Sequence, residues 1–244
     1  MYCYSQNQQT LSTYNLNLEH ICQPDILNLF SDASMKHRGS SFASCYGSVA
    51  VTGDRTIEDY LRIQSDTTVP AAELRGIRCS LTLALKYKDY FRVINLFSDS
   101  QLSVYTLREY IYNWKYDPSI NNYRTRNCRH TPVVNIELIL ECFDLLQMLR
   151  RDGKIINIYH QSGHVDNGYE NIAKAAKVFK ASNNIRGNID FDLIRYISIY
   201  NNYIDNKTRN YLSMAHTNTT DNWYHDPIKY IPNGNLYTIR GEQK

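Results

Sequence analysis

Short apolar runs alternate with longer amphipathic segments along the chain, and this pattern predicts a protein that mixes strands with helices. The short runs are rich in apolar and β-branched residues, which is typical of strands. The longer segments repeat apolar residues at spacings of three and four, the period of a helix with one buried face. We therefore expect strands at 26–32, 42–52, 57–64, 92–98 and 154–159, and helices at 71–87, 101–114, 134–150, 169–181 and 188–204.

The order of these elements predicts one α/β domain. Three successive strands form an antiparallel meander, and the later strands are separated by helices, which is the arrangement of parallel strands. The expected architecture is a mixed five-stranded sheet with helices on both faces. We assign residues 1–25 to an N-terminal arm, 26–183 to the domain, and 184–244 to an extension that is first helical and then irregular. A basic turn is expected at 35–41 and a basic, tyrosine-bearing loop at 115–132.

One sequence phrase occurs twice, and each copy ends in an aspartate. An apolar strand leads into Asp32 in the first copy (ILNLFSD) and into Asp99 in the second (VINLFSD). If the two strands are parallel neighbours, both carboxylates reach the same edge of the sheet, where oxygen ligands could hold a divalent cation. Aspartate after a strand is also common in turns and helix caps, so either position alone is ambiguous.

Composition narrows the class of protein only a little. The 27 basic and 24 acidic residues give a net charge of +3, which neither indicates nor excludes nucleic-acid binding. No apolar run is long enough to span a membrane, and the chain does not open on a secretory signal. The 6 cysteines are scattered and predict neither disulfides nor a zinc site. We expect no membrane association and a cytoplasmic, nucleoid or nuclear location.

Four phrases together resemble the type 1 ribonuclease H family. FSDAS (residues 30–34) is similar to its first-strand T-D-G-S phrase, and AELRGI (72–77) to its A-E-L helix. FSDSQ (97–101) is similar to its T-D-S-Q phrase, and SGH (162–164) to its G-H loop. The phrases occur in the family's order, in matching strand and helix settings, and the resemblance covers about residues 26–181.

The resemblance implies a nuclease that hydrolyses the RNA strand of RNA–DNA hybrids with two Mg²⁺ or Mn²⁺ ions. Asp32, Glu73 and Asp99 would bind the metal, and His164 would assist proton transfer or product release. These four residues are the expected catalytic group. Glu73 near a helix N-terminus also has an ordinary stabilising role against the helix dipole. We expect the nucleic acid to contact residues that flank the two aspartates, namely Ser34, Lys36, Arg38, Ser100 and Gln101.

The chain departs from the family pattern in two places. The family has a fourth carboxylate about ten residues after the histidine, and Lys174 stands at that position here, with Asp166 as a nearby substitute. The family's glycine-rich turn after the first strand is replaced by MKHRG (35–39), which changes how the backbone can approach RNA.

Two alternatives follow. Loss of the fourth carboxylate favours a nucleic-acid-binding module of the same fold with impaired catalysis. The second alternative is a nuclease of this fold that acts on another substrate, such as branched DNA.

Overall fold

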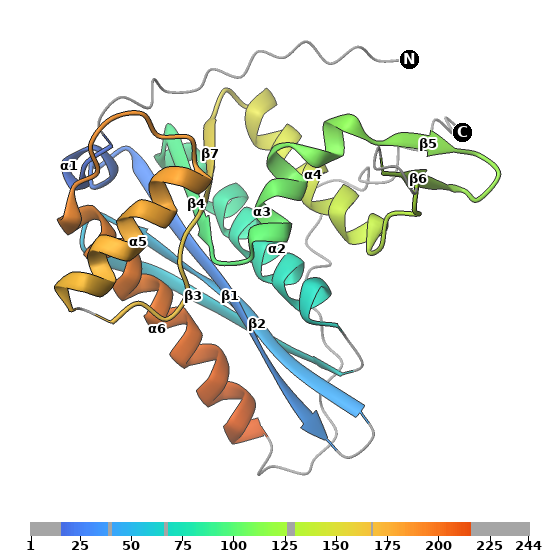
Figure 1. Cartoon of the computed structure of the whole chain (residues 1–244), viewed down its shortest axis with the longest axis horizontal. Coiled ribbons are helices and arrows are strands. Elements are labelled where there is room, and N and C mark those ends of the chain that lie inside the picture. Colours follow the sequence, from blue (N-terminus) through green and yellow to red (C-terminus); the bar gives the residue numbers. More distant parts are fainter. Residues whose placement is uncertain (1–15, 39–40, 66–67, 126–129, 167, 216–244) are drawn as a thin grey trace.

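A computed structural model describes residues 16–38, 41–65, 68–125, 130–166 and 168–215. Most of the expected N-terminal arm and the end of the expected C-terminal extension therefore lie outside the described residues. Within the described residues, five strands form the main sheet and two short ones form a separate hairpin, with six α-helices around them (Figure 1). The main strands are β1 (Ile26–Arg38), β2 (Ser41–Thr52), β3 (Arg55–Ser65), β4 (Val93–Ser98) and β7 (Ile155–His160). The helices are α1 (Leu18–Ile21), α2 (Val69–Tyr87), α3 (Gln101–Arg108), α4 (Ile136–Arg151), α5 (Tyr169–Ser182) and α6 (Phe191–Ala215).

The sheet has the order β3-β2-β1-β4-β7, which confirms the predicted mixed topology. β1, β2 and β3 pair antiparallel, whereas β4 lies parallel to both β1 and β7. The repeated phrases also pair with each other in the sheet: Ile26 to Ser31 of β1 lie opposite Val93 to Ser98 of β4.

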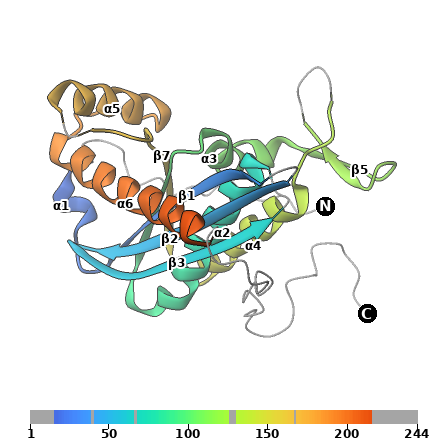
Figure 2. The ribbon, with the colours of Figure 1, turned by 90° about the horizontal axis from the view of Figure 1, so that it is seen from below.

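Helices cover both faces of this sheet, as predicted (Figure 2). Alternate residues of β1 point to opposite faces, because side chains alternate along a strand. Leu27 and Leu29 belong to the core beneath α2, α3 and α4. Phe30 belongs to the second core, beneath α5 and α6, where its ring stacks at 5.3 Å from the ring of Tyr200. Both faces of the central strands are thus buried, and the sheet holds the two halves of the domain together.

Asparagine side chains, buried in β1 and β4 and half-buried in β7, link the three parallel strands. Asn95 donates to Asn28 at 2.9 Å, and Asn157 donates to Asn95 at 2.9 Å. Asn28 in turn donates to the main-chain oxygen of Ile21 at 2.7 Å. Because a slipped strand would leave buried amides without partners, this row favours the observed register.

Several boundaries differ from the predicted ones. β1 continues through residues 35–38, which were expected to turn, because their main chain pairs with residues 41–44 of β2. α3 ends at Arg108 and is followed by the short 3₁₀ segment Tyr110–Asn113. The segment 115–132, which was expected to be a basic loop, contains a hairpin formed by β5 (Lys115–Asp117) and β6 (Asn122–Arg124). These segments are short and polar, so the hydrophobic pattern that guided the prediction carries no signal for them.

The helix α6 is longer than predicted and belongs to the packed domain. It lies across β1 and β2, and Leu193, Ile194, Ile197 and Ile204 are buried in the second core. Its place on the sheet brings residues after 184 against the strand that carries Asp32 (Figure 1). None of the described helices is long and apolar enough to cross a bilayer.

Candidate functional site

Asp32 lies in β1 where the pairing with β4 stops. The last paired residues of the two strands are Ser31 and Ser98, while β1 itself continues beside β2. Asp32 shares a strand face with Asn28 and Phe30, both of which contact α6 residues. Its residue exposure is 5%, so the carboxyl group is almost completely removed from solvent.

Asp99 directly follows β4, one residue beyond the end of the parallel pairing. The loop after β7 passes very close to it, at Gly163. A Cβ atom built on Gly163 would lie 2.5 Å from Oδ2 of Asp99, so only glycine fits there without movement. The loop that carries His164 is therefore packed directly against this carboxylate.

Glu73 comes from α2, which begins beside the sheet. The side chain of Thr68 caps this helix by accepting from the amide of Ala71 at 3.4 Å. One turn after Glu73, the helix backbone approaches β1 at Gly76, where an added Cβ would lie 3.0 Å from the main-chain oxygen of Asp32. This close approach of helix and strand brings the first turns of α2, and with them Glu73, to the level of Asp32.

The structure brings these three carboxyl groups together. One oxygen from each of Asp32, Glu73 and Asp99 lies within 4.8 Å of the others. The Oε2 atom of Glu73 is buried and has no hydrogen-bond partner among the described residues. Three clustered carboxylates with an unsatisfied buried oxygen fit a hard divalent cation such as Mg²⁺, which takes oxygen ligands.

Electrostatics within the cluster favour protonation when no cation is bound. Burial, with the negative charges of Asp99 and Asp205, raises the pKa of Asp32 to about 8. Burial, with the negative charges of Asp32, Asp99 and Asp205, raises the pKa of Glu73 to about 9. Burial also raises the pKa of Asp99. A bound cation would offset this repulsion and hold the groups in their ionised form.

A fourth carboxyl group, which the sequence analysis did not identify, comes from α6. Asp205 interacts with the side chain of Asp32 by a hydrogen bond and by its charge, and it is only 8% exposed. It follows Ile204, a fully buried residue of the stripe that packs on the sheet. The sequence signal for Asp205 was an acidic residue beside the apolar stripe of a long helix. This signal does not indicate where the helix packs, so it does not place Asp205 near Asp32.

The two residues predicted for the fourth position lie elsewhere. Lys174 is exposed on α5, and Asp166 is exposed in the loop before it. Among the described residues, the charges that shift the pKa values of Asp32 and Glu73 include Asp205 and not these two. The predicted position differs because two amphipathic helices follow His164, and the second of them, α6, brings Asp205 into contact with Asp32.

His164 lies at the edge of the cluster in contact with α6. Its Nδ1 atom is 3.3 Å from Oδ2 of Asp205, and the guanidinium Nη2 of Arg209 is 3.2 Å from the ring. Arg209 also donates through Nε to Oδ1 of Asp205 at 2.8 Å. The side chain of His164 is 64% exposed, and its charge lowers the pKa of Asp99, so it borders both solvent and the cluster.

The residues predicted to contact nucleic acid flank the two aspartates. Lys36 is exposed on β1, and Gln101 is exposed at the first position of α3. Ser34 is half-buried, as is Ser100, whose hydroxyl donates to Ser103 at 2.8 Å. Arg38 ends β1, and its side chain lies outside the described part of the structure.

The chain is similar to a known family and to several solved structures. The chain matches the RNase H family model over residues 24–180, which is more than half of its length. It is similar to RNase H1 from the halophilic archaeon Halobacterium salinarum NRC-1, at 18% identity and a TM-score of 0.38, over 63% of this chain and 93% of that one. LC11-RNase H1 from compost, solved with an RNA/DNA hybrid, gives 16% identity and a TM-score of 0.36, over 65% of this chain and 96% of that one.

A foamy viral protease–reverse transcriptase, also solved with an RNA/DNA hybrid, gives 14% identity and a TM-score of 0.47. That similarity covers 75% of this chain and 22% of the viral chain. No curated protein matches the sequence.

Proposed function

Because the chain belongs to the RNase H family, we propose that it is a metal-dependent endonuclease that hydrolyses the RNA strand of RNA–DNA hybrids. The observation that carries this proposal is the cluster of Asp32, Glu73 and Asp99, whose oxygens lie within 4.8 Å of one another on the sheet edge. Such a cluster is costly to bury without a cation, because like charges repel most strongly away from solvent.

We assign the fourth carboxylate to Asp205. It approaches Asp32 from the α6 side, whereas Glu73 approaches from α2 on the opposite side of the sheet. Four carboxyl groups from four different parts of the fold would hold two Mg²⁺ or Mn²⁺ ions, with Asp32 at the centre of the four. When bound, the ions would activate the attacking water and stabilise the leaving oxygen.

The remaining proposed roles belong to side chains around the cluster. His164, bordered by Asp205 and Arg209, is placed to accept or deliver a proton and to help product leave. Ser34, Lys36, Arg38, Ser100 and Gln101 would contact the hybrid backbone close to the cluster. Lys36 and Gln101 are exposed and therefore accessible to such a substrate.

The hairpin β5–β6 is a further candidate surface for nucleic acid. Tyr116 is exposed at its start, and Lys115 beside it is exposed as well. Aromatic and basic side chains of this kind suit base stacking and phosphate contact. Figure 1 shows that the hairpin projects from the end of the molecule next to α4, away from α5 and α6.

The test is cleavage of a labelled RNA–DNA hybrid while Mg²⁺ and Mn²⁺ are titrated. We expect metal-dependent cutting of the RNA strand, and its loss in Asp32→Asn and in Asp99→Asn, because each variant removes a metal-binding carboxylate. Cutting that survives in both variants would refute the assignment of the site.

The same assay distinguishes the alternatives. Hybrid binding by a folded protein without cleavage at any metal concentration would identify a binding module. Cleavage of branched DNA but not of hybrids would identify a nuclease with another substrate. The impaired-module alternative rests on Lys174, and the contact of Asp205 with Asp32 supports Asp205 as the carboxylate that takes this place.

A further inference from the structure

Asp99 is backed by two polar side chains that are almost fully buried. Gln161 is 2% exposed and follows β7, and its main-chain N–H donates to the main-chain oxygen of Ser98, the residue before Asp99, at 3.1 Å. Asn201 is 1% exposed and lies on α6, one helical turn before Asp205. Amides buried this deeply are costly unless their hydrogen bonds are satisfied, so their partners indicate what they do.

These side chains form a directed chain of hydrogen bonds that ends on Asp99. Nε2 of Gln161 donates to Oδ1 of Asn201. The side chain of Asn201 in turn hydrogen-bonds the carboxyl group of Asp99. An ionised carboxylate only accepts, so it requires the NH₂ side of the asparagine. Because Gln161 occupies the oxygen side, Asn201 presents its donors to Asp99 and cannot turn over without losing both contacts.

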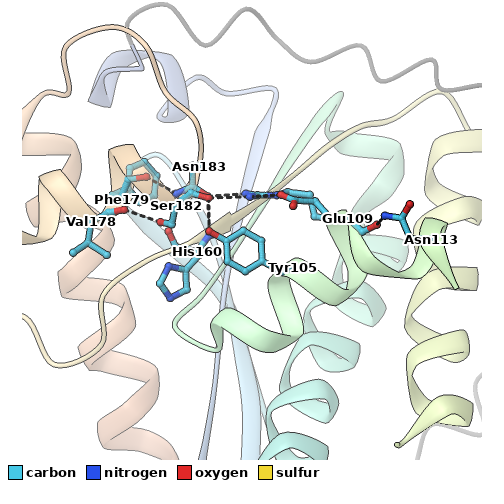
Figure 3. Close-up of polar contacts among 9 residues, drawn as sticks. Tyr105, Glu109, Asn113, His160, Val178, Phe179, Ser182 and Asn183 are labelled. Atoms are coloured by element: carbon cyan, nitrogen blue, oxygen red, sulfur yellow. Dashed lines mark hydrogen bonds and ion pairs between the residues drawn. The ribbon is translucent and has the colours of Figure 1, made fainter. Parts of the chain in front are cut away.

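The main chain of Asp99 is held by the residue next to Gln161. The ring of His160 hydrogen-bonds the main-chain oxygen of Asp99. Figure 3 shows Asn183 and Tyr105 beside His160. Asn183 accepts from the His160 amide at 2.9 Å and donates to its carbonyl at 2.7 Å, and the Tyr105 ring stacks at 6.5 Å from the imidazole. The strand end that carries His160 and Gln161 is thus locked to α5 and α3.

We propose that Gln161 and Asn201, with His160, are positioning residues that orient the Asp99 carboxylate for the divalent cation. Asn201 engages Asp99 from the α6 side, and the loop at Gly163 closes on its Oδ2 atom, which restricts the carboxylate to orientations facing Asp32 and Glu73. Residues behind metal ligands are known to set ligand orientation and metal affinity. This inference rests on the proposed function, because it assigns a role within the same site.

The test measures Mg²⁺ binding by calorimetry without substrate. Asn201→Leu and Gln161→Met each keep roughly the original side-chain volume and remove the donor. We expect each to weaken Mg²⁺ binding by about 10-fold. Because Gln161 acts through Asn201, the double variant should bind Mg²⁺ no more weakly than Asn201→Leu alone.

Asn157→Leu is the matched control. Asn157 lies in β7, the strand that leads to His160, and its side chain donates to Asn95 of β4 at 2.9 Å. The variant therefore removes an amide donor of the same kind that does not contact Asp99. We expect it to lower stability and leave Mg²⁺ affinity unchanged. If Asn201→Leu does not fold, the Mg²⁺ affinity of Gln161→Met still tests the inference.

The outcomes separate this inference from the proposed function. Wild-type protein that binds Mg²⁺, with unchanged affinity in Asn201→Leu or in Gln161→Met, would overturn the inference alone. Additive losses in the double variant would also overturn it, since they would mean two independent structural effects. Wild-type protein that binds no Mg²⁺ would refute the metal site itself, and the inference with it.

Discussion

At the scale of single residues, Asp205 combines two opposing contacts. Its Oδ1 atom accepts from Arg209 at 2.8 Å, and the side chain also contacts Asp32, another acid. The positive charge of the Arg209 guanidinium offsets part of the repulsion between the carboxyl groups of Asp205 and Asp32. Arg209 and Asp205 are four residues apart on α6, so one helix supplies both the acid and the charge that makes its burial tolerable.

Replacing Asp205 with asparagine should lower the rate of hybrid cleavage by about 100-fold, because a metal-binding carboxylate is lost. Lys174→Ala is the control, since Lys174 is exposed on α5, and it should cleave at the wild-type rate. Single-turnover rates at saturating Mg²⁺ measure both. A normal rate in Asp205→Asn would contradict our assignment of the fourth carboxylate.

Gly163→Ala should weaken Mg²⁺ binding by about 10-fold, because the new Cβ would lie 2.5 Å from Oδ2 of Asp99 and must displace it. Gly168→Ala is a fitting control in the same loop region, since its Cβ would meet only Asn171, at 3.7 Å. Calorimetric titration with Mg²⁺ compares the two variants. Equal affinities would show that Asp99 tolerates the displacement.

At the scale of elements, α6 is fastened to the sheet by a row of tyrosines. The hydroxyls of Tyr196 and Tyr200 donate to the main-chain oxygens of Gly53 and Asp54, at 2.7 and 3.0 Å. Tyr203 donates to the carboxylate of Asp59 at 2.9 Å. These contacts join the helix to the turn between β2 and β3 and to β3 itself. Asn201 and Asp205 therefore reach the cluster from a helix that is anchored along its length.

Changing Tyr196, Tyr200 and Tyr203 together to phenylalanine should destabilise the protein by about 4 kcal/mol, at about 1 kcal/mol for each of four hydrogen bonds, since Tyr196 also accepts from Asn28. The rings remain, so packing on Phe30 is retained. Urea unfolding measures the loss, and hydrogen exchange should show reduced protection in α6. Tyr112→Phe removes a contact with Arg150 on the opposite face and serves as the control. Unchanged exchange in α6 would contradict the anchoring role.

At the scale of the whole molecule, the acidic cluster makes stability depend on pH and metal. Folding raises the pKa of Asp32 from 3.8 to about 8 and that of Glu73 from 4.5 to about 9. Between these values the folded chain binds more protons than the unfolded chain, so its stability falls as pH rises. The contribution is most favourable below pH 4 and is lost progressively up to about pH 9.

Metal-free protein should therefore lose several kcal/mol of stability between pH 5 and pH 9, because both carboxyl groups release their protons in this range. Mg²⁺ should restore most of this loss at pH 9, because a cation stabilises the ionised carboxylates of the folded state. Thermal unfolding in chelator and in Mg²⁺ measures both effects. Asp32→Asn should show a flatter pH profile and a smaller response to Mg²⁺. Identical profiles for the variant and the wild type would contradict the raised pKa of Asp32.

Much of the fold and part of the site follow from the sequence alone. The apolar runs before Asp32 and Asp99 are too short for helices, and their closely similar phrases align residue by residue in the parallel pair β1–β4. That local pattern is sufficient to predict that the two aspartates share one edge of the sheet. Glu73 is placed with them by the resemblance of its AELRGI phrase to the family's helix, and the periodic pattern supplies only the helix itself. Strand and helix periods are local properties, so the sequence determines them directly.

Only the tertiary structure decided which helix completes the cluster. α5 and α6 are both amphipathic and both follow His164, so their patterns do not distinguish Lys174 from Asp205 as the neighbour of Asp32. The choice depends on packing: α6 lies across β1 and β2, held by tyrosine contacts with residues more than a hundred positions away in the chain. The positions of Gln161 and Asn201 behind Asp99 are likewise set by where the end of β7 meets α6. Contacts between distant segments arise from the fit of whole surfaces, which no local period encodes.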